Sequence, residues 1–346
     1  MNSKARFYHP PQGTFFDPLS GEYKVRWFQE SDLDAYIRGL NETLYERYDE
    51  ARFKWKMVNT PFSLGFVSIA VAEFEGKPVG FNSFLPLKIR AGVDSFPIVQ
   101  GCDGFVESEH RKMGLFQQTL RFMVRELAER GPEMLMGFNF AGSTGAAQKM
   151  GSMITGDVHA LAATVSNLRR INVEGEEDVE VEHCSLGEAH QLYEDWAYST
   201  SLLHYDKPEK YFRWRYSHPI RKSSFYRIRD GGEVGFVAIS LEHADVNTYN
   251  IFLEDYTPLF HRPRVASAAI KRLLDTDERL NEVYMTATMS SPLNKTARLL
   301  GFQQDHVYTL IMRNICNLKE QDKKLYRGNV ELTRVEDWHI TSSDVF

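Results

Sequence analysis

The sequence predicts an α/β protein, with a mixed and largely antiparallel sheet and helices, in two tandem domains of the same kind. Three observations predict this fold. The chain has 346 residues, which is more than one hydrophobic core usually serves, so two domains are expected. Strand-like and helix-like segments alternate along it. Several short motifs also occur twice in the same order.

The clearest repeated motif is an aromatic and basic run around a tryptophan. Residues 53–57 read FKWKM, and residues 212–216 read FRWRY. A charged glycine turn followed by Val-Gly-Phe comes after each run, at 75–81 and at 230–236. Because order and approximate spacing are both kept, the pattern indicates an internal duplication.

The domain boundary is expected in an acidic stretch, residues 172–180. Its run of Glu-Gly-Glu-Glu-Asp cannot bury itself and indicates a solvated linker or turn. The predicted domains are therefore 1–172 and 173–346. Trp55 and Trp214 of the repeated motif are expected to be core anchors, with the long basic side chains laid alongside them.

The elements of the first domain follow from apolar pattern, caps and turn residues. A β-rich segment leads into a Glu-Ser-Asp cap cluster and an amphipathic helix with its stripe on Leu33, Ile37 and Leu40. The expected strands are 23–28, 68–74, 79–87, 99–106 and 133–138, of which the second and third form a hairpin. The later helices are expected at 114–130 and 143–150. Two glycines inside 99–106 indicate a bulge.

Composition and charge exclude several classes of function. There are 41 basic and 47 acidic side chains, so the net charge of -6 would repel nucleic acid, and no basic patch offsets it. The cysteines Cys102, Cys184 and Cys316 form no CxxC pair, so neither a disulfide framework nor a zinc site is predicted. A reducing cytoplasm fits this usage. Residues 1–17 do not read as a secretory signal, and the longest apolar stretch, 62–74, is too short to span a bilayer.

The segment that carries chemistry is 106–116, VESEHRKMGLF, where a predicted strand turns directly into the clearest helix. The unpaired amides and the positive dipole end of such a helix favour a phosphate-bearing ligand. Gly114 lets the backbone approach that ligand, and Arg111 and Lys112 add positive charge beside it.

This segment resembles the pyrophosphate loop of the GNAT acyltransferase superfamily, which runs Arg or Gln, two residues, Gly, one residue, Gly or Ala after a strand ending in valine. The run from Arg111 to Phe116 matches it, with Val106 in the expected place. Phe116 departs from the small residue, as in a branch that ends Gly-hydrophobic-Phe. Asn139 resembles the family's second cofactor-facing motif. The resemblance therefore implies that the residues facing the cofactor are Val106, Arg111, Lys112, Met113, Gly114, Leu115, Phe116 and Asn139.

The same resemblance implies that the protein is an N-acyltransferase. It would move an acetyl or short acyl group from acetyl-CoA or another acyl-CoA, without a metal, to the amine of a small molecule such as an amino sugar. A backbone amide near Val106 would polarise the thioester carbonyl. The candidate bases are Asp103, Glu107 and Glu109, and Asp103 ranks first because it lies on the strand before the loop.

The general acid is less clear. The tyrosine that many members keep near the end of the second helix is Ala147 here, so the acid is missing, moved or supplied by the second half. His204 and Tyr205 are substitutes without positional support, and a surface or core role is expected for each.

The second domain is expected to be a degenerate GNAT-like copy. Its corresponding loop, 257–264, has no glycine at the approach position and two prolines that remove amide donors. Two alternatives stay open: a Fem-type aminoacyl transferase, which needs no pyrophosphate loop, and a non-catalytic acyl-CoA-binding module. The expected partner is a small-molecule amine, with no nucleic acid and no membrane, and a homodimer stays open.

Overall fold

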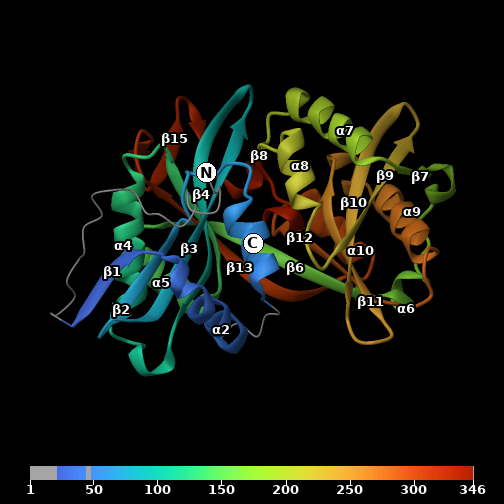
Figure 1. Cartoon of the computed structure of the whole chain (residues 1–346). Coiled ribbons are helices and arrows are strands. Elements are labelled where there is room, and N and C mark those ends of the chain that lie inside the picture. The colour runs from blue at the N-terminus through green and yellow to red at the C-terminus, as the bar shows by residue number, and fades with distance from the viewer. Residues whose placement is uncertain (1–21, 44–47, 346) are drawn as a thin grey trace.

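The computed structural model describes residues 22–43 and 48–345. The segment 1–17, discussed above as unlike a secretory signal, lies outside them. Its main feature is one large sheet that runs through both halves of the molecule, with helices on its faces (Figure 1). The predicted mixed and largely antiparallel α/β fold is confirmed.

The two halves have the same order of elements apart from β8, which occurs only in the second, and the short α6, which occurs only in the first. The first contains β1 (Tyr23–Trp27), α2 (Leu33–Thr43), α3 (Glu50–Phe53), β2 (Ile69–Phe74), β3 (Lys77–Ala91), β4 (Asp94–Val106), α4 (Leu115–Leu127), β5 (Met134–Asn139), α5 (Ala141–Lys149), β6 (Met153–Thr164) and the short α6 (Val165–Leu168). The second contains β7 (Glu180–Cys184), α7 (Leu186–Ser199), β8 (Leu203–Tyr205), α8 (Glu209–Arg215), β9 (Lys222–Asp230), β10 (Glu233–His243), β11 (Tyr249–Tyr256), α9 (Pro263–Leu274), β12 (Leu280–Thr288), α10 (Pro292–Leu299) and β13 (Gln303–Asn314). A C-terminal segment follows, with β14 (Lys319–Gln321), β15 (Lys324–Arg327), β16 (Val330–Glu331) and β17 (Trp338–His339).

The halves exchange their last strands. The sheet runs β1-β2-β3-β4-β5-β13-β6-β12-β11-β10-β9-β7, so β13 completes the first half and β6 lies against the second. Leu310 of β13 is opposite Phe138 of β5, and Leu161 of β6 is opposite Met285 of β12. In Figure 1, β6 crosses from the first half into the yellow and orange half. The boundary at 172/173 stays a prediction, but the two halves share one sheet across it.

The predicted tryptophan anchors are confirmed, and they meet at the centre of the molecule. The rings of Trp55 and Trp214 stack with centroids 5.1 Å apart and planes at 13°. Each indole N–H donates to the other residue's backbone carbonyl, at 2.7 Å from Trp55 and 2.6 Å from Trp214. The repeated motif therefore forms a symmetric contact between the halves, and burying two such rings contributes substantially to the shared core.

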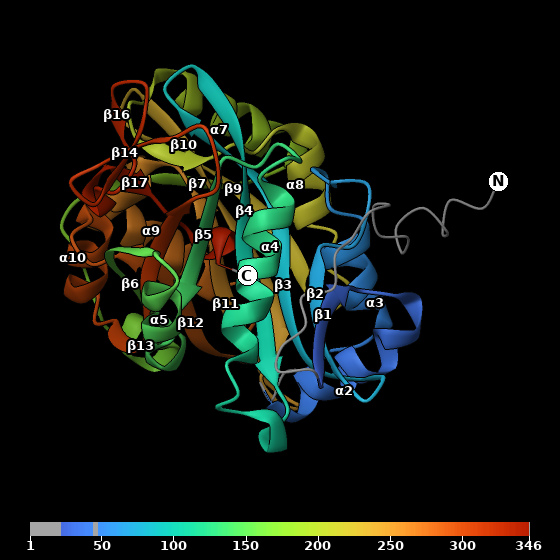
Figure 2. The same cartoon turned by 90° about the vertical axis from the view of Figure 1, so that its left-hand side faces the viewer.

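Two local features of the first half position its site. First, β4 pairs with β5 in parallel only from Ile98 to Gly101, and the two strands then diverge. Second, β4 contains a bulge at Asp103 and Gly104, which together lie opposite Asn82 of β3. The bulge that the glycines indicated is thus confirmed. Figure 2 shows α4 in front of β3 and β4, with β5 and α5 to its left. In the described ranges, no helix has the length and apolar character needed to cross a membrane.

Candidate functional site

A cleft of about 170 Å³ opens where β4 and β5 diverge, beneath α4 and α5. Its inner walls are apolar, with Phe84, Leu120 and Leu135 packed in the core around α4. Of the residues predicted to form the site, it brings together Asp103, Phe116 and Asn139.

Glycines on one face of the sheet make this hollow. Gly101, Gly104 and Gly137 all line the cleft. A Cβ at Gly137 would lie 2.8 Å from Oδ1 of Asn139, and one at Gly104 would lie 3.2 Å from the Phe116 ring. Any side chain at either place would therefore crowd the cleft. The departure at Phe116 is accommodated because Gly104 leaves room for its ring.

The start of α4 presents the predicted amide cradle. Gly114 caps the helix with φ +77°, a left-handed conformation that favours glycine. The first hydrogen bond of the helix runs from Gln118 N to Gly114 O at 3.1 Å, so the preceding amides at positions 115–117 have no carbonyl of their own helix to bind. A Cβ at Gly114 would meet no described atom within 4 Å, so this approach to the amides is open.

The other loop residues have distinct roles. The side chain of Arg111 is exposed and donates from Nε to the Val106 carbonyl at 3.0 Å, which ties the loop to the end of β4. Lys112 and Met113 are exposed as well. Leu115 is buried against Val79, so only its amide can face a ligand.

Asp103 lies in the cleft wall, but it is part of a buried ion pair. Its Oδ2 is 2.7 Å from Nζ of Lys56, and the two side chains are only 6% and 3% exposed. Tyr36 also donates to this oxygen, at 3.4 Å. Burial alone would lower the pKa of Lys56, but the Asp103 carboxylate raises it above its ordinary value. A base must take up a proton, and a proton on Asp103 would remove the negative charge that pairs with Lys56. The ion pair therefore counts against Asp103 as the base.

The two other candidate bases lie outside the cleft. Glu107 is half-buried at the end of β4, where its amide donates to the Val79 carbonyl at 2.9 Å, and Glu109 is exposed in the turn that follows. The sequence reasoning missed Asn82, which lines the cleft from β3. No motif marks it, because its position depends on the pairing of β3 with the bulge.

The comparisons bear on this geometry. No family model and no curated protein matches the chain. Several solved structures do match the chain. The GCN5-related N-acetyltransferase from Anabaena variabilis ATCC 29413 matches with TM-score 0.62 and 13% identity, over 85% of this chain and 73% of that one. The enzyme of the same description from Kribbella flavida has TM-score 0.59 and 14% identity, over 85% and 71%. A conserved protein from Enterococcus faecalis V583, described as a probable N-acyltransferase, has TM-score 0.59 and 9% identity, over 85% and 73%.

The chain has the GCN5-related N-acetyltransferase fold. The resemblance read from the loop 106–116 is thus confirmed for the fold. The resemblance implies that the acyl thioester lies along the strand before the loop, which is β4, and β4 forms one wall of this cleft.

At the position where many members of the GNAT fold keep a tyrosine as general acid, this chain has an alanine. Ala147 lines the cleft and is buried, so no hydroxyl stands there. The hydroxyl of Tyr205 donates to Oε1 of Gln100 at 2.7 Å, and burial lowers the pKa of His204 to about 4. Both residues lie in the core, on β8, and neither lines the cleft.

The second GNAT-like half differs at its corresponding loop. Arg262 and Arg264, at the start of α9, both pair with Asp230, at 2.9 Å and 2.7 Å. Arg262 also pairs with Glu233. Pro263 removes an amide at the first helical position. The basic side chains that could meet a phosphate are therefore already neutralised by the chain's own carboxylates.

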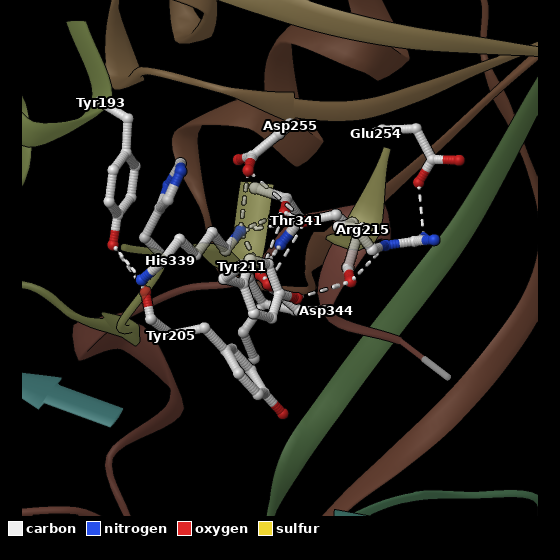
Figure 3. Close-up of polar contacts among 12 residues, drawn as sticks. Tyr193, Tyr205, Tyr211, Arg215, Glu254, Asp255, His339, Thr341 and Asp344 are labelled. Carbon is white, nitrogen blue, oxygen red and sulfur yellow. Dashed lines mark hydrogen bonds and ion pairs between the residues drawn. The ribbon is translucent and has the colours of Figure 1, made fainter. Parts of the chain in front are cut away.

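The C-terminal segment crosses the diverging strands of the second half. Nε2 of His339 donates to the carbonyl of Tyr256, at the end of β11, at 2.9 Å. Lys207 holds the segment from the other side, with Nζ 3.0 Å from Asp255 of β11 and 2.7 Å from Asp344. Figure 3 shows Asp255, Thr341 and Asp344 turned toward one another. The C-terminal segment thus covers the matching place in the second half, where a cavity of about 200 Å³ remains between His339 and the ends of β11 and β12.

Proposed function

We propose that the chain is an N-acyltransferase that moves an acetyl or short acyl group from acyl-CoA to an amine of a small molecule. One observation carries this proposal. The cleft between β4 and β5 is open and reaches Phe116 in the first turn of α4, whereas the chain's own C-terminal segment crosses the matching place in the second half.

Support for this proposal comes from three parts of the donor: the pyrophosphate, the pantetheine arm and the acyl group. The amides at positions 115–117, with Arg111 and Lys112, suit the pyrophosphate. The diverging strands offer backbone groups to the amides of the pantetheine arm. The apolar inner walls suit an acyl group, and Asn139 at the cleft wall can position the arm.

The proposed reaction is nucleophilic attack by the neutral amine on the thioester carbonyl. The new C–N bond forms as the carbonyl electron pair moves onto oxygen. The C–S bond then breaks, and the sulfur leaves as coenzyme A thiol after taking up a proton. The amine's proton passes to Asp103 or to a water chain. This chemistry needs a base and a carbonyl donor and no metal.

The test is amine-dependent release of coenzyme A thiol from acetyl-CoA, measured over a panel of small amines with amino sugars first. We expect release that requires both the amine and the intact loop, so Gly114→Asp should abolish it. Thiol release without any amine dependence would contradict the proposal.

A non-catalytic acyl-CoA-binding role is the second candidate. It is favoured by Ala147 at the acid position and by the Lys56–Asp103 ion pair, because together they leave no evident acid and a constrained base. Acetyl-CoA binding without turnover on any amine of the panel would favour it. We further propose a cytoplasmic location, which suits three cysteines that form no disulfide.

A further inference from the structure

The cavity in the second half is large enough to hold a small molecule of its own. Its volume is about 200 Å³, and it lies beyond Phe252 and Tyr284, the last residues at which β11 and β12 pair. It shares no lining residue with the cleft between β4 and β5. A cavity of about 150 Å³ in another protein binds benzene, so this one has room for a small aromatic ring.

His339 presents a free ring nitrogen to this cavity. The residue is 5% exposed, and its Nε2 donates to the Tyr256 carbonyl at 2.9 Å. Because Nε2 carries the proton, Nδ1 of the neutral ring is a hydrogen-bond acceptor. Nδ1 has no partner among the described residues and is not enclosed, whereas Nε2 of His204 is both unpaired and enclosed. Since His339 lines the cavity, the accessible Nδ1 faces it.

His261 adds a second imidazole to the same cavity, from the 3₁₀ turn 258–261 that follows β11. Its ring centroid is 5.7 Å from that of His339. Neither of its ring nitrogens has a hydrogen-bond partner among residues 22–43 and 48–345, and neither is enclosed. A neutral imidazole has one N–H donor and one acceptor nitrogen, so His261 can donate to a ligand that His339 binds as an acceptor.

The charges around the two rings favour a neutral ligand. Burial lowers the pKa of His261 to about 4. Burial also lowers the pKa of His339 well below its ordinary value, with smaller contributions from His261 and from Lys207, which is itself ion-paired. Both rings are therefore neutral near pH 7. Glu336 is exposed at the edge of the cavity, and its carboxylate would repel an anion.

The rest of the cavity wall is mainly apolar, with the side chains of Leu202, Tyr256, Leu293, Trp338 and Ile340. Buried polar groups nearly always have a hydrogen-bond partner, so the free imidazole nitrogens indicate a partner inside the cavity. Water alone would leave the apolar walls hydrated, which is unfavourable. An aromatic ring with one polar group satisfies the walls and the nitrogens together.

A hydroxyl is the polar group that fits both imidazoles, because its oxygen donates one hydrogen bond and accepts another. Two hydrogen bonds of about 2.8 Å at one oxygen join nitrogens up to about 5 Å apart. That separation is compatible with ring centroids 5.7 Å apart.

We propose that this cavity binds a small, neutral aromatic alcohol of the phenol class, whose hydroxyl donates to Nδ1 of His339 and accepts from the N–H of His261. The aromatic ring of the ligand packs against the apolar wall. Because the cavity is separate from the cleft between β4 and β5, this inference does not depend on the proposed function.

The test is titration of the intact chain with phenol, followed by the ring ¹⁵N resonances of its histidines. We expect the resonances of His261 and His339 to shift, with a Kd of about 0.1–1 mM, which is within reach of a ligand of this size. Toluene has the same shape without the hydroxyl, and benzoate is an anion. Each should bind at least about fivefold more weakly than phenol.

His261→Phe is the test variant, because it keeps a ring and breaks no hydrogen bond to a described residue. It should fold, bind phenol at least about fivefold more weakly than wild type, and lose most of the preference for phenol over toluene. His243→Phe is the matched control. The His243 ring packs on Tyr249 and does not line the cavity, so this variant should bind phenol as wild type does.

Three results would overturn the proposal. They are no phenol binding, which would leave the cavity to water only, equal affinities for phenol and toluene in wild type, and unchanged phenol affinity in folded His261→Phe. If His261→Phe does not fold, the resonances of the wild-type protein decide, since phenol that binds without shifting those of His261 and His339 lies elsewhere.

Discussion

Gly114 offers the sharpest test of where the pyrophosphate binds. Gly114→Asp and Gly114→Asn add side chains of equal size, and both residue types tolerate the left-handed backbone at φ +77°. Neither Cβ meets a described atom within 4 Å, so the folding cost should be limited to about 1–2 kcal/mol of backbone strain in both. The two variants therefore differ only in charge.

The expected difference follows from Coulomb's law. A carboxylate about 6 Å from each of the two pyrophosphate charges, at an effective dielectric constant of about 40, costs about 1.4 kcal/mol for each charge. The sum, about 3 kcal/mol, predicts about 100-fold weaker acetyl-CoA binding for the Asp variant than for the Asn variant.

Calorimetric titration with acetyl-CoA at about 0.05 M salt and again at about 0.5 M salt measures this difference. The gap between the variants should narrow at high salt, because the added ions screen the new charge. Wild-type affinity in a folded Gly114→Asp protein would place the pyrophosphate elsewhere.

Three further predictions follow from the same contacts. A fragment of residues 1–172 should be insoluble or inactive because it lacks β13, which pairs with β5; a soluble, monomeric and fully active fragment would disprove this. Asp103→Asn should cut turnover by roughly a hundredfold with acyl-CoA affinity kept, as expected for loss of a base. Lys56→Gln breaks the same ion pair but keeps the Asp103 carboxylate, so this variant should be less stable and retain turnover. An equal loss of turnover in Lys56→Gln and Asp103→Asn would show that the ion pair has a structural role and that Asp103 is not the base. Burial lowers the pKa of His204 and of His261 to about 4, so both stay neutral in the folded state while the unfolded chain takes up protons below about pH 6.5. The free energy of unfolding should therefore decrease as the pH is lowered, by about 2 kcal/mol for each histidine at pH 5. Equal free energies of unfolding at pH 7 and pH 5, measured with a denaturant, would contradict this.

Much of the first half could be predicted because its signals are local. The helix that begins at Gly114 has a cap, a stripe and a preceding strand within a few residues, and it was found as α4. The hairpin of β2 and β3 has its turn residues between two β-rich runs. The repeated tryptophans were also correctly assigned to the core, because large aromatics flanked by long basic side chains favour burial.

The rest depends on contacts between distant segments. The sequences of β6 and β13 are compatible with pairing in either half, so the exchange of these strands could not be predicted from the sequence. The polar C-terminal segment would be expected at the surface, yet Thr341 and Asp344 are fully buried because Lys207 supplies a partner 134 or more positions away. The ion pair of Asp103 with Lys56 escaped notice for the same reason.

The central claim is that each chain carries one acyl-CoA site, in the cleft of the first half. In the second half the C-terminal segment crosses the matching place and is bonded to the end of β11, and the loop arginines are paired with Asp230. Calorimetric titration of the intact chain with acetyl-CoA measures the stoichiometry directly. We predict one equivalent per chain for wild type and none for Gly114→Asp at the same concentrations. Two equivalents for wild type, or one equivalent that persists unchanged in Gly114→Asp, would contradict the account.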